Sequence, residues 1–132
     1  MISLENRLAI YELIARYAHC CDNYRSEEWA AMFVKDGILG FGPNPMVGQQ
    51  AIADKSDALR EGPTEYRHVI TNIYLDDQAT NVRATARAYG TVMDWATQPP
   101  RIAIFADYRF EVVFEDGRWK FAFVEVGLPY SS

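Results

Sequence analysis

Asp22 is a carboxylate in an unexpected position near the end of the first predicted helix. Residues 3–24 are typical of a helix, because small and apolar side chains recur there at helical spacing. These side chains are Leu4, Leu8, Tyr11, Ile14, Ala15, Ala18 and Cys21. Asp22 follows Tyr11 by eleven residues, about three turns at ~3.6 residues per turn, so it projects from the apolar stripe. A buried carboxylate needs a partner. Either Asp22 finds a donor in a pocket, or it lies at the helix end and reaches water or caps the next segment.

His68 is the second candidate for chemistry, because an imidazole can act as a general base near neutral pH. It lies at the start of a predicted strand, residues 66–75, whose alternation groups His68 with Ile70, Asn72 and Tyr74. Both faces of this strand are mixed, so the pattern leaves open which face is the inner one. A single strand histidine can equally be a hydrogen-bonded core or edge residue. His19, the other histidine, falls on the polar stripe of the first helix and is expected to be solvated.

Two further residues could assist these groups. Tyr17 flanks the apolar stripe about one turn before Asp22 and could offer a hydroxyl to a pocket. Asn72 could orient a ligand carbonyl. Asp94 and Glu125 are carboxylates in strands, and a hydrolytic reaction would require one of them to point inward.

The elements that must position these residues are helices first and strands afterwards. A second short helix begins after Ser26, carries Trp29, Met32 and Phe33, and ends before Asp36. A strand at residues 38–41 and a helix at residues 48–60 follow. Strands are then predicted at residues 66–75, 82–95, 102–114 and 118–126. This order predicts a single α+β domain over residues 1–132 with a mainly antiparallel sheet.

The predicted sheet offers room for a pocket. Small residues (Ala84, Ala86, Ala88 and Gly90) lie on one face of the strand at 82–95, and they leave space for a ligand or for a closely packed helix. Aromatic residues make up 14% of the chain, which suits either an aromatic core or an apolar cavity. Apolar residues lie on both sheet faces, which favours a homo-oligomer, most simply a dimer.

Several functions are disfavoured by composition. The formal net charge is −5 and no two Lys or Arg residues are adjacent, so nucleic acid is not an expected partner. No apolar run approaches the ~20 residues of a membrane helix, and the N-terminus lacks signal-peptide features, so a cytoplasmic location is expected. Cys20 and Cys21 are neighbours and cannot easily be bridged. One histidine and one aspartate are too few ligands for zinc, and no cofactor-binding motif is present, so neither metal nor cofactor is expected.

An ordered set of short motifs runs along nearly the whole chain. The set comprises Tyr17-Ala18-x-x-x-Asp22, Glu28-Trp29-x-x-Met32-Phe33-x-x-Asp36-Gly37, Gly48-x-x-x-Ile52, Arg67-His68-x-x-x-Asn72, and Tyr108-x-Phe110-x-x-x-Phe114-x-x-Gly117-x-Trp119-Lys120-Phe121. This set resembles the SnoaL-like group of the nuclear transport factor 2-like superfamily. The resemblance implies a cone-shaped fold in which three helices close a strongly curved sheet over a deep pocket. Relatives of this kind include scytalone dehydratases, polyketide cyclases, dehydrochlorinases and dioxygenase small subunits.

The resemblance also implies a site. Asp22 and His68 match the aspartate–histidine dyad of the dehydratase and dehydrochlorinase branches, and Tyr17 matches an aromatic pocket position. Phe33, Asn72, Val92 and Phe110 are the further residues expected to contact a substrate. The dehydratases carry a second pocket histidine, and this chain has Val92 near that position.

Two functions from different classes follow from these residues. The first is a cofactor-independent acid–base enzyme, of dehydratase, isomerase or cyclase type, acting on a small apolar carbonyl compound through Asp22 and His68. The second is a non-catalytic domain that binds a small ligand, or serves as an accessory subunit, with the same pocket and a structural Asp22–His68 pair.

Overall fold

The first helix, α1, spans Leu4–Asp22 in a computed structural model that describes residues 1–128. The Ser3 hydroxyl caps it by accepting a hydrogen bond from the backbone N–H of Asn6 at 3.1 Å. The buried face of α1 consists of Ile10, Ile14, Tyr17, Ala18, Cys20, Cys21 and Asp22. The predicted stripe is therefore wrong at its beginning, because Leu4 and Leu8 are 73% and 60% exposed. The face that meets the sheet is rotated toward Ile10 and includes Asp22.

The second helix is shorter than its sequence predicts. Helix α2 spans Ser26–Ala31, and the strand β1, Phe33–Phe41, begins where the sequence predicts more helix. Two hydrogen bonds fix this change: Phe121 N–H donates to the Met32 carbonyl, and the Gln49 side chain donates to the Phe33 carbonyl, each at 2.8 Å. Tertiary pairing with a distant strand thus overrides the local helical pattern at Phe33.

The remaining elements follow the predicted order, apart from one short strand that was not predicted. A two-residue strand β2, Met46–Val47, precedes helix α3, Gln49–Glu61. Strands β3 (Tyr66–Leu75), β4 (Arg83–Asp94), β5 (Arg101–Glu115) and β6 (Arg118–Gly127) complete the chain. None of the helices within residues 1–128 has the length and apolar character needed to cross a membrane.

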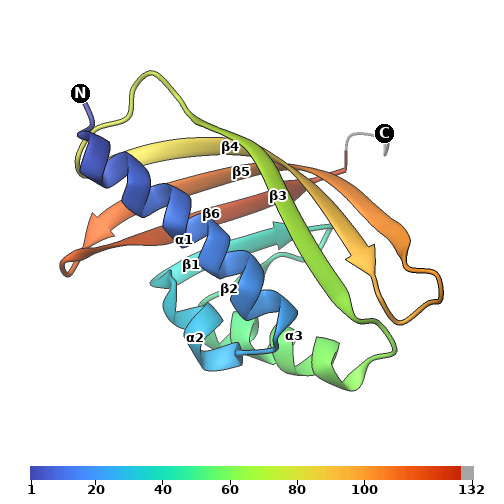
Figure 1. The fold of residues 1–132 in the computed structure, drawn as a ribbon. Coiled ribbons are helices and arrows are strands. Elements are labelled where there is room, and N and C mark those ends of the chain that lie inside the picture. Colours follow the sequence, from blue (N-terminus) through green and yellow to red (C-terminus); the bar gives the residue numbers. More distant parts are fainter. Residues whose placement is uncertain (129–132) are drawn as a thin grey trace.

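The six strands form one sheet in the order β2-β1-β6-β5-β4-β3. All neighbouring pairs are antiparallel except β1 and β6, which are parallel. The sheet curves strongly, so that β3 crosses in front of the other strands while α1 lies against its inner face and α2 and α3 lie beside β1 and β2 (Figure 1). The structure is therefore the α+β fold with three helices and a mainly antiparallel sheet that the sequence predicts.

A β-bulge in β3 changes the predicted alternation of that strand. The register with β4 shifts between Thr71 and Tyr74, and Asn72 adopts a left-handed backbone conformation with φ of 56°. His68 and Ile70 face inward before the bulge, whereas Ile73 and Leu75 do so after it. The prediction that Asn72 and Tyr74 share a face with His68 is therefore wrong, because the extra residue reverses the alternation.

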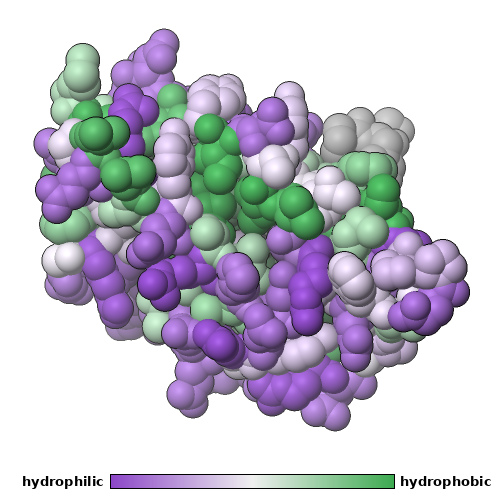
Figure 2. Space-filling model, viewed as in Figure 1, coloured by the Kyte–Doolittle hydropathy of each residue, from purple (hydrophilic) through white to green (hydrophobic). Residues whose placement is uncertain are grey.

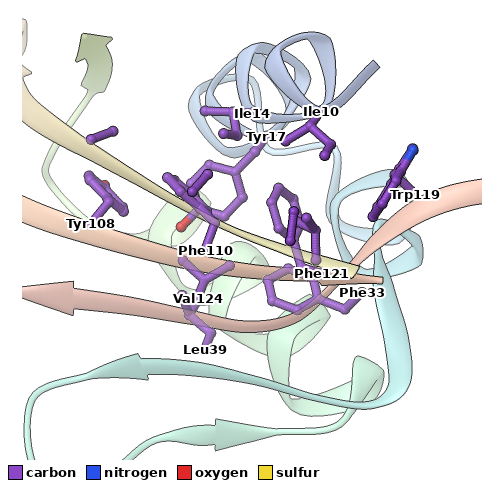
Figure 3. Packing of buried hydrophobic residues seen from close by; sticks show 14 of the residues in the cluster. Ile10, Ile14, Tyr17, Phe33, Leu39, Tyr108, Phe110, Trp119, Phe121 and Val124 are labelled. Atoms are coloured by element: carbon purple, nitrogen blue, oxygen red, sulfur yellow. The ribbon is translucent and has the colours of Figure 1, made fainter. Parts of the chain in front are cut away.

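The core lies between α1 and the inner sheet face. Tyr17 points from α1 onto the sheet, where its ring meets Phe110 and Phe121 at centroid distances of 5.8 and 5.5 Å (Figure 3). The small residues of β4 lie on this inner face, and Ala84, Ala86 and Ala88 are each at most 5% exposed. They leave the space into which the tyrosine rings project.

Candidate functional site

Asp22 and His68 form a hydrogen-bonded pair. The His68 Nδ1 atom lies 2.6 Å from Asp22 Oδ1, and the two side chains are 12% and 7% exposed. Because an ionised carboxylate can only accept, this contact places the proton on Nδ1. Among residues 1–128 the other ring nitrogen, Nε2, has no hydrogen-bond partner. The aspartate–histidine pair that the family resemblance implies is therefore present in the structure.

The pair is held by the backbone as well as by the side chains. The His68 backbone N–H donates to both carboxylate oxygens of Asp22, at 2.9 and 3.1 Å. Strand β3 is the last strand of the sheet, so this amide points away from its neighbour β4 and toward the end of α1. The Asp22 carbonyl also accepts a hydrogen bond from Arg67 Nη1 at 3.4 Å. Together with the bond to Nδ1, which fixes the imidazole, four hydrogen bonds thus join the last turn of α1 to the start of β3.

The His68 ring lies in the wall of a mainly apolar cavity of about 160 Å³. The cavity is lined by Tyr17, Cys21, Trp29, Leu39, Phe41, Met46, Lys55, Leu59, Tyr66, His68, Val92, Ile104, Tyr108 and Val126. An apolar cavity of about 150 Å³ can hold a benzene ring. This space therefore fits a compact ligand built around one ring.

Two of the larger hollows in the described residues also border α1. One, of about 390 Å³, is a groove between α1 and β3 that is bordered by Asp22 and His68 on the opposite side of the ring. Its walls include Ile14, Ala18, Ile70 and Ile73, and Figure 2 shows apolar surface between these two elements. The other, of about 630 Å³, lies between α1 and the β5–β6 hairpin, far from the pair. The 160 Å³ cavity is the candidate site, because its lining is more apolar than that of the α1–β3 groove and it brings His68 together with the buried residues Tyr17 and Tyr108.

Two tyrosine hydroxyls belong to this cavity. Tyr17 and Tyr108 are 2% and 4% exposed, and within residues 1–128 no hydrogen bond joins either hydroxyl to another residue. Burial raises the pKa of both phenols above the usual 10.0, and the charge of Asp22 adds to the effect. Both groups therefore remain protonated near neutral pH, and each can donate a hydrogen bond to a ligand oxygen.

Cys21 brings a thiol next to the pair. Its sulfur, an Asp22 oxygen and a His68 nitrogen lie within 4.8 Å of one another, the arrangement nearest to a metal site in the described part of the chain. Burial, with a smaller contribution from the charge of Asp22, raises the pKa of the Cys21 thiol to about 12. A protonated thiol is a poor nucleophile and a poor metal ligand, and Asp22 is already occupied by His68. These residues fit a hydrogen-bonded pair better than a metal centre.

Some predicted contact residues line the cavity and others do not. Tyr17 and Val92 line it. Phe33 and Phe110 are fully buried in the core instead: Phe33 packs on Phe121 at 5.4 Å, and Phe110 stacks on Tyr108 at 5.1 Å. They pack behind the lining and are not among the residues that line the cavity.

Asn72 also lies outside the cavity. It is exposed on the bulge of β3, and its residue type has a backbone explanation, because asparagine tolerates a left-handed conformation better than most residues. Asp94 is buried but accepts hydrogen bonds from the backbone N–H groups of Glu65 and Ala96. Glu125 is exposed and paired with Arg109. Neither carboxylate reaches the cavity to support hydrolysis.

Sequence reasoning did not identify Lys55, Tyr66 or Tyr108 as cavity residues. Tyr108 could have been found, because it lies on the apolar face of its strand and pairs in register with Ala88. Cys21 could have been found from its position beside Asp22. Lys55 has no such signal, because a lysine on a predicted helix is ordinarily solvated.

Comparison with solved structures shows a nuclear transport factor 2-like fold, also called cystatin-like. An NTF2-like protein with a cystatin-like fold from Novosphingobium aromaticivorans is 26% identical over 98% of this chain and 85% of its own, with a TM-score of 0.84. A candidate scytalone dehydratase from the same organism is 25% identical over 94% of this chain and 87% of its own, with a TM-score of 0.80. A Catenulispora acidiphila protein in complex with S-DNPA is 24% identical over 96% of this chain and 95% of its own, with a TM-score of 0.83.

The sequence identifies the family directly. The profile of the SnoaL-like domain matches residues 3–125. The chain therefore belongs to the SnoaL-like family, as its ordered motifs predict. No curated protein matches it.

Proposed function

We propose that this protein is a cofactor-independent acid–base enzyme of the dehydratase, isomerase or cyclase type. Its substrate is a small, largely apolar carbonyl compound held in the cavity. The observation that supports the proposal most directly is the 2.6 Å contact between His68 Nδ1 and Asp22 Oδ1, in a ring that lines a mainly apolar cavity. This contact leaves the Nε2 lone pair available as a general base.

In the proposed reaction, His68 Nε2 removes a proton from the carbon next to the substrate carbonyl. The Asp22 carboxylate holds the ring in the required tautomer and stabilises the imidazolium that forms. The electron pair moves onto the carbonyl oxygen, where the hydroxyl of Tyr17 or Tyr108 donates a hydrogen bond. The imidazolium then returns the proton to a leaving hydroxyl, to another carbon or to an aldol oxygen. The substrate carbonyl serves as the electron sink, so no cofactor is required.

Proton abstraction can be measured without knowing the natural substrate. The probe is acetophenone, a one-ring ketone, and the measurement is deuterium incorporation into its methyl group in D₂O, followed by NMR. We expect the wild-type protein to accelerate this exchange. His68→Gln and Asp22→Asn should each lower the enzyme-dependent rate by ~10²–10⁴-fold. The double variant should lose little more than either single variant, because the two residues act as one unit.

His19→Gln is the matched control, because it removes the exposed histidine of α1 and leaves the cavity intact. Its exchange rate should equal that of the wild type. Asp22 also supports the backbone of β3, so thermal unfolding of each variant must show that the fold is retained. Exchange at the wild-type rate in both single variants would contradict the proposal and favour a non-catalytic ligand-binding domain.

A further inference from the structure

Lys55 is the one residue with a formal charge in the cavity lining, when histidine is counted as neutral. It lies on α3, across the cavity from the sheet, and is half-buried. The other lining residues are aliphatic, aromatic or neutral polar. A single cation in a wall of this kind is unfavourable unless an anion approaches it.

No acidic partner satisfies this cation within residues 1–128, where the Lys55 ammonium has no ion pair and no hydrogen bond. The helix positions one turn away on either side are Ala51, Ile52, Ala58 and Leu59, none of which is acidic. Lys120 differs from Lys55 in having acidic partners. It is similarly protected and is paired with Glu115 and Asp116 at 3.5 and 3.6 Å.

The charge of Lys55 acts on a neighbouring residue of the cavity lining, Cys21. It lowers the pKa of the Cys21 thiol, in opposition to the larger effect of burial. The Cys21 sulfur lies within 4.8 Å of the reacting pair, Asp22 and His68. An anionic group bound to Lys55 would therefore share the cavity with the atoms that carry out the chemistry.

We propose that Lys55 binds a carboxylate of the substrate, which makes the substrate class a compact, one-ring organic acid. The ring would pack against the apolar lining, with Leu39, Ile104 and Val126 among its contacts, and the carboxylate would face α3. The inference that the bound acid is a substrate rests on the proposed function, whereas the preference for an anion concerns binding alone. Because the whole protein carries a net charge of −5, the preference must come from a local cation.

The test compares benzoate with benzamide, two ligands of nearly the same shape that differ in charge. NMR titration gives the dissociation constant of each for the wild type, Lys55→Gln and Lys35→Gln. A charge-assisted hydrogen bond predicts that the wild type binds benzoate roughly tenfold or more tightly than benzamide. Lys55→Gln should weaken benzoate binding to the level of benzamide and leave benzamide binding unchanged. Lys35→Gln removes an exposed lysine of β1 outside the cavity and should keep the preference.

The variant His68→Gln tests whether benzoate is attracted by Lys55 or by the His68 imidazole. Loss of the preference in His68→Gln, with its retention in Lys55→Gln, would overturn the proposal. Equal binding of the two ligands by the wild type, or binding of neither, would overturn it as well. The proposed function fails independently, in the deuterium exchange experiment, because a carboxylate preference set by Lys55 does not require His68 to abstract a proton.

Discussion

At the scale of single residues, Asp22 could be identified as a site residue from the sequence, because burying a carboxylate without a hydrogen-bond donor is energetically costly. Its carboxylate projects from an apolar helix face, and the structure supplies the donor that such a group requires. His68 was identifiable mainly through the family resemblance, because a lone strand histidine has several ordinary explanations. Lys55 was not identifiable, because only the three-dimensional lining shows that its charge faces an apolar space.

The Cys21 thiol predicts alkaline destabilisation of the fold. Burial raises its pKa from 9.0 in the unfolded chain to about 12 in the folded one. Between these values the unfolded chain releases the proton and the folded chain keeps it, so the free energy of unfolding falls as pH rises from 9 toward 12. Below that window both states are protonated, and the thiol adds no pH dependence.

Urea unfolding at about pH 8 and about pH 10.5 measures this effect. Cys21→Ala should lose less stability between the two pH values than the wild type does. Tyr17 and Tyr108 also titrate at high pH, but they are common to both proteins. An equal loss in the two proteins would show that the thiol is not the group responsible.

At the scale of elements, most helices and strands could be predicted because their periodicity reflects a single buried face. β4 is an example, since its alternating alanines are the ones that lie inside. The predictions failed at Phe33 and beyond Thr71. At Phe33 the chain pairs with the distant strand β6 instead of continuing the helix. Beyond Thr71 a β-bulge inserts one residue into β3. Neither event leaves a local signal, because each depends on hydrogen bonds to a partner strand.

The contact between β4 and β5 predicts a specific packing conflict. A Cβ atom at Gly90 would overlap the ring of Tyr108, which lines the cavity. Gly90→Ala should therefore destabilise the protein by about 1–3 kcal/mol, the usual range for overpacking. Tyr108→Leu should relieve the conflict, so the double variant should be more stable than the sum of the single effects predicts. Urea denaturation of the four proteins measures this, and additive free energies would contradict the explanation.

At the scale of the whole molecule, the outer face of the sheet is the natural place for self-association. Tyr89 and Phe105 are 60% and 51% exposed on the face opposite the helices, and both flank the ladder between β4 and β5. Neighbouring charged residues, Arg109 with Glu111 and Glu125, form ion pairs at 3.0 and 3.4 Å. An apolar centre with a polar rim is typical of protein interfaces.

We expect a homodimer that uses this face. Sedimentation at high micromolar concentration should show twice the mass of the 15.1 kDa chain. Phe105→Lys should shift the protein toward the monomer, because it places a charge at the centre of the interface. Leu8→Lys is the matched control, since Leu8 is 60% exposed on α1, away from this face. A wild-type protein that sediments only as the single chain would rule the dimer out.

The double attachment of Asp22 to His68 has a consequence for the history of the family. The carboxylate orients the imidazole, and it also occupies the backbone amide of a strand that has no neighbour on that side. Under the proposed function, a descendant that abandoned catalysis would still lose a backbone anchor if it replaced Asp22. Selection for folding alone can therefore preserve this aspartate after selection for turnover has ended. An aspartate retained at this position in a relative would then indicate only that the fold is retained. Retention of the histidine and of the cavity around it would indicate that the chemistry is retained.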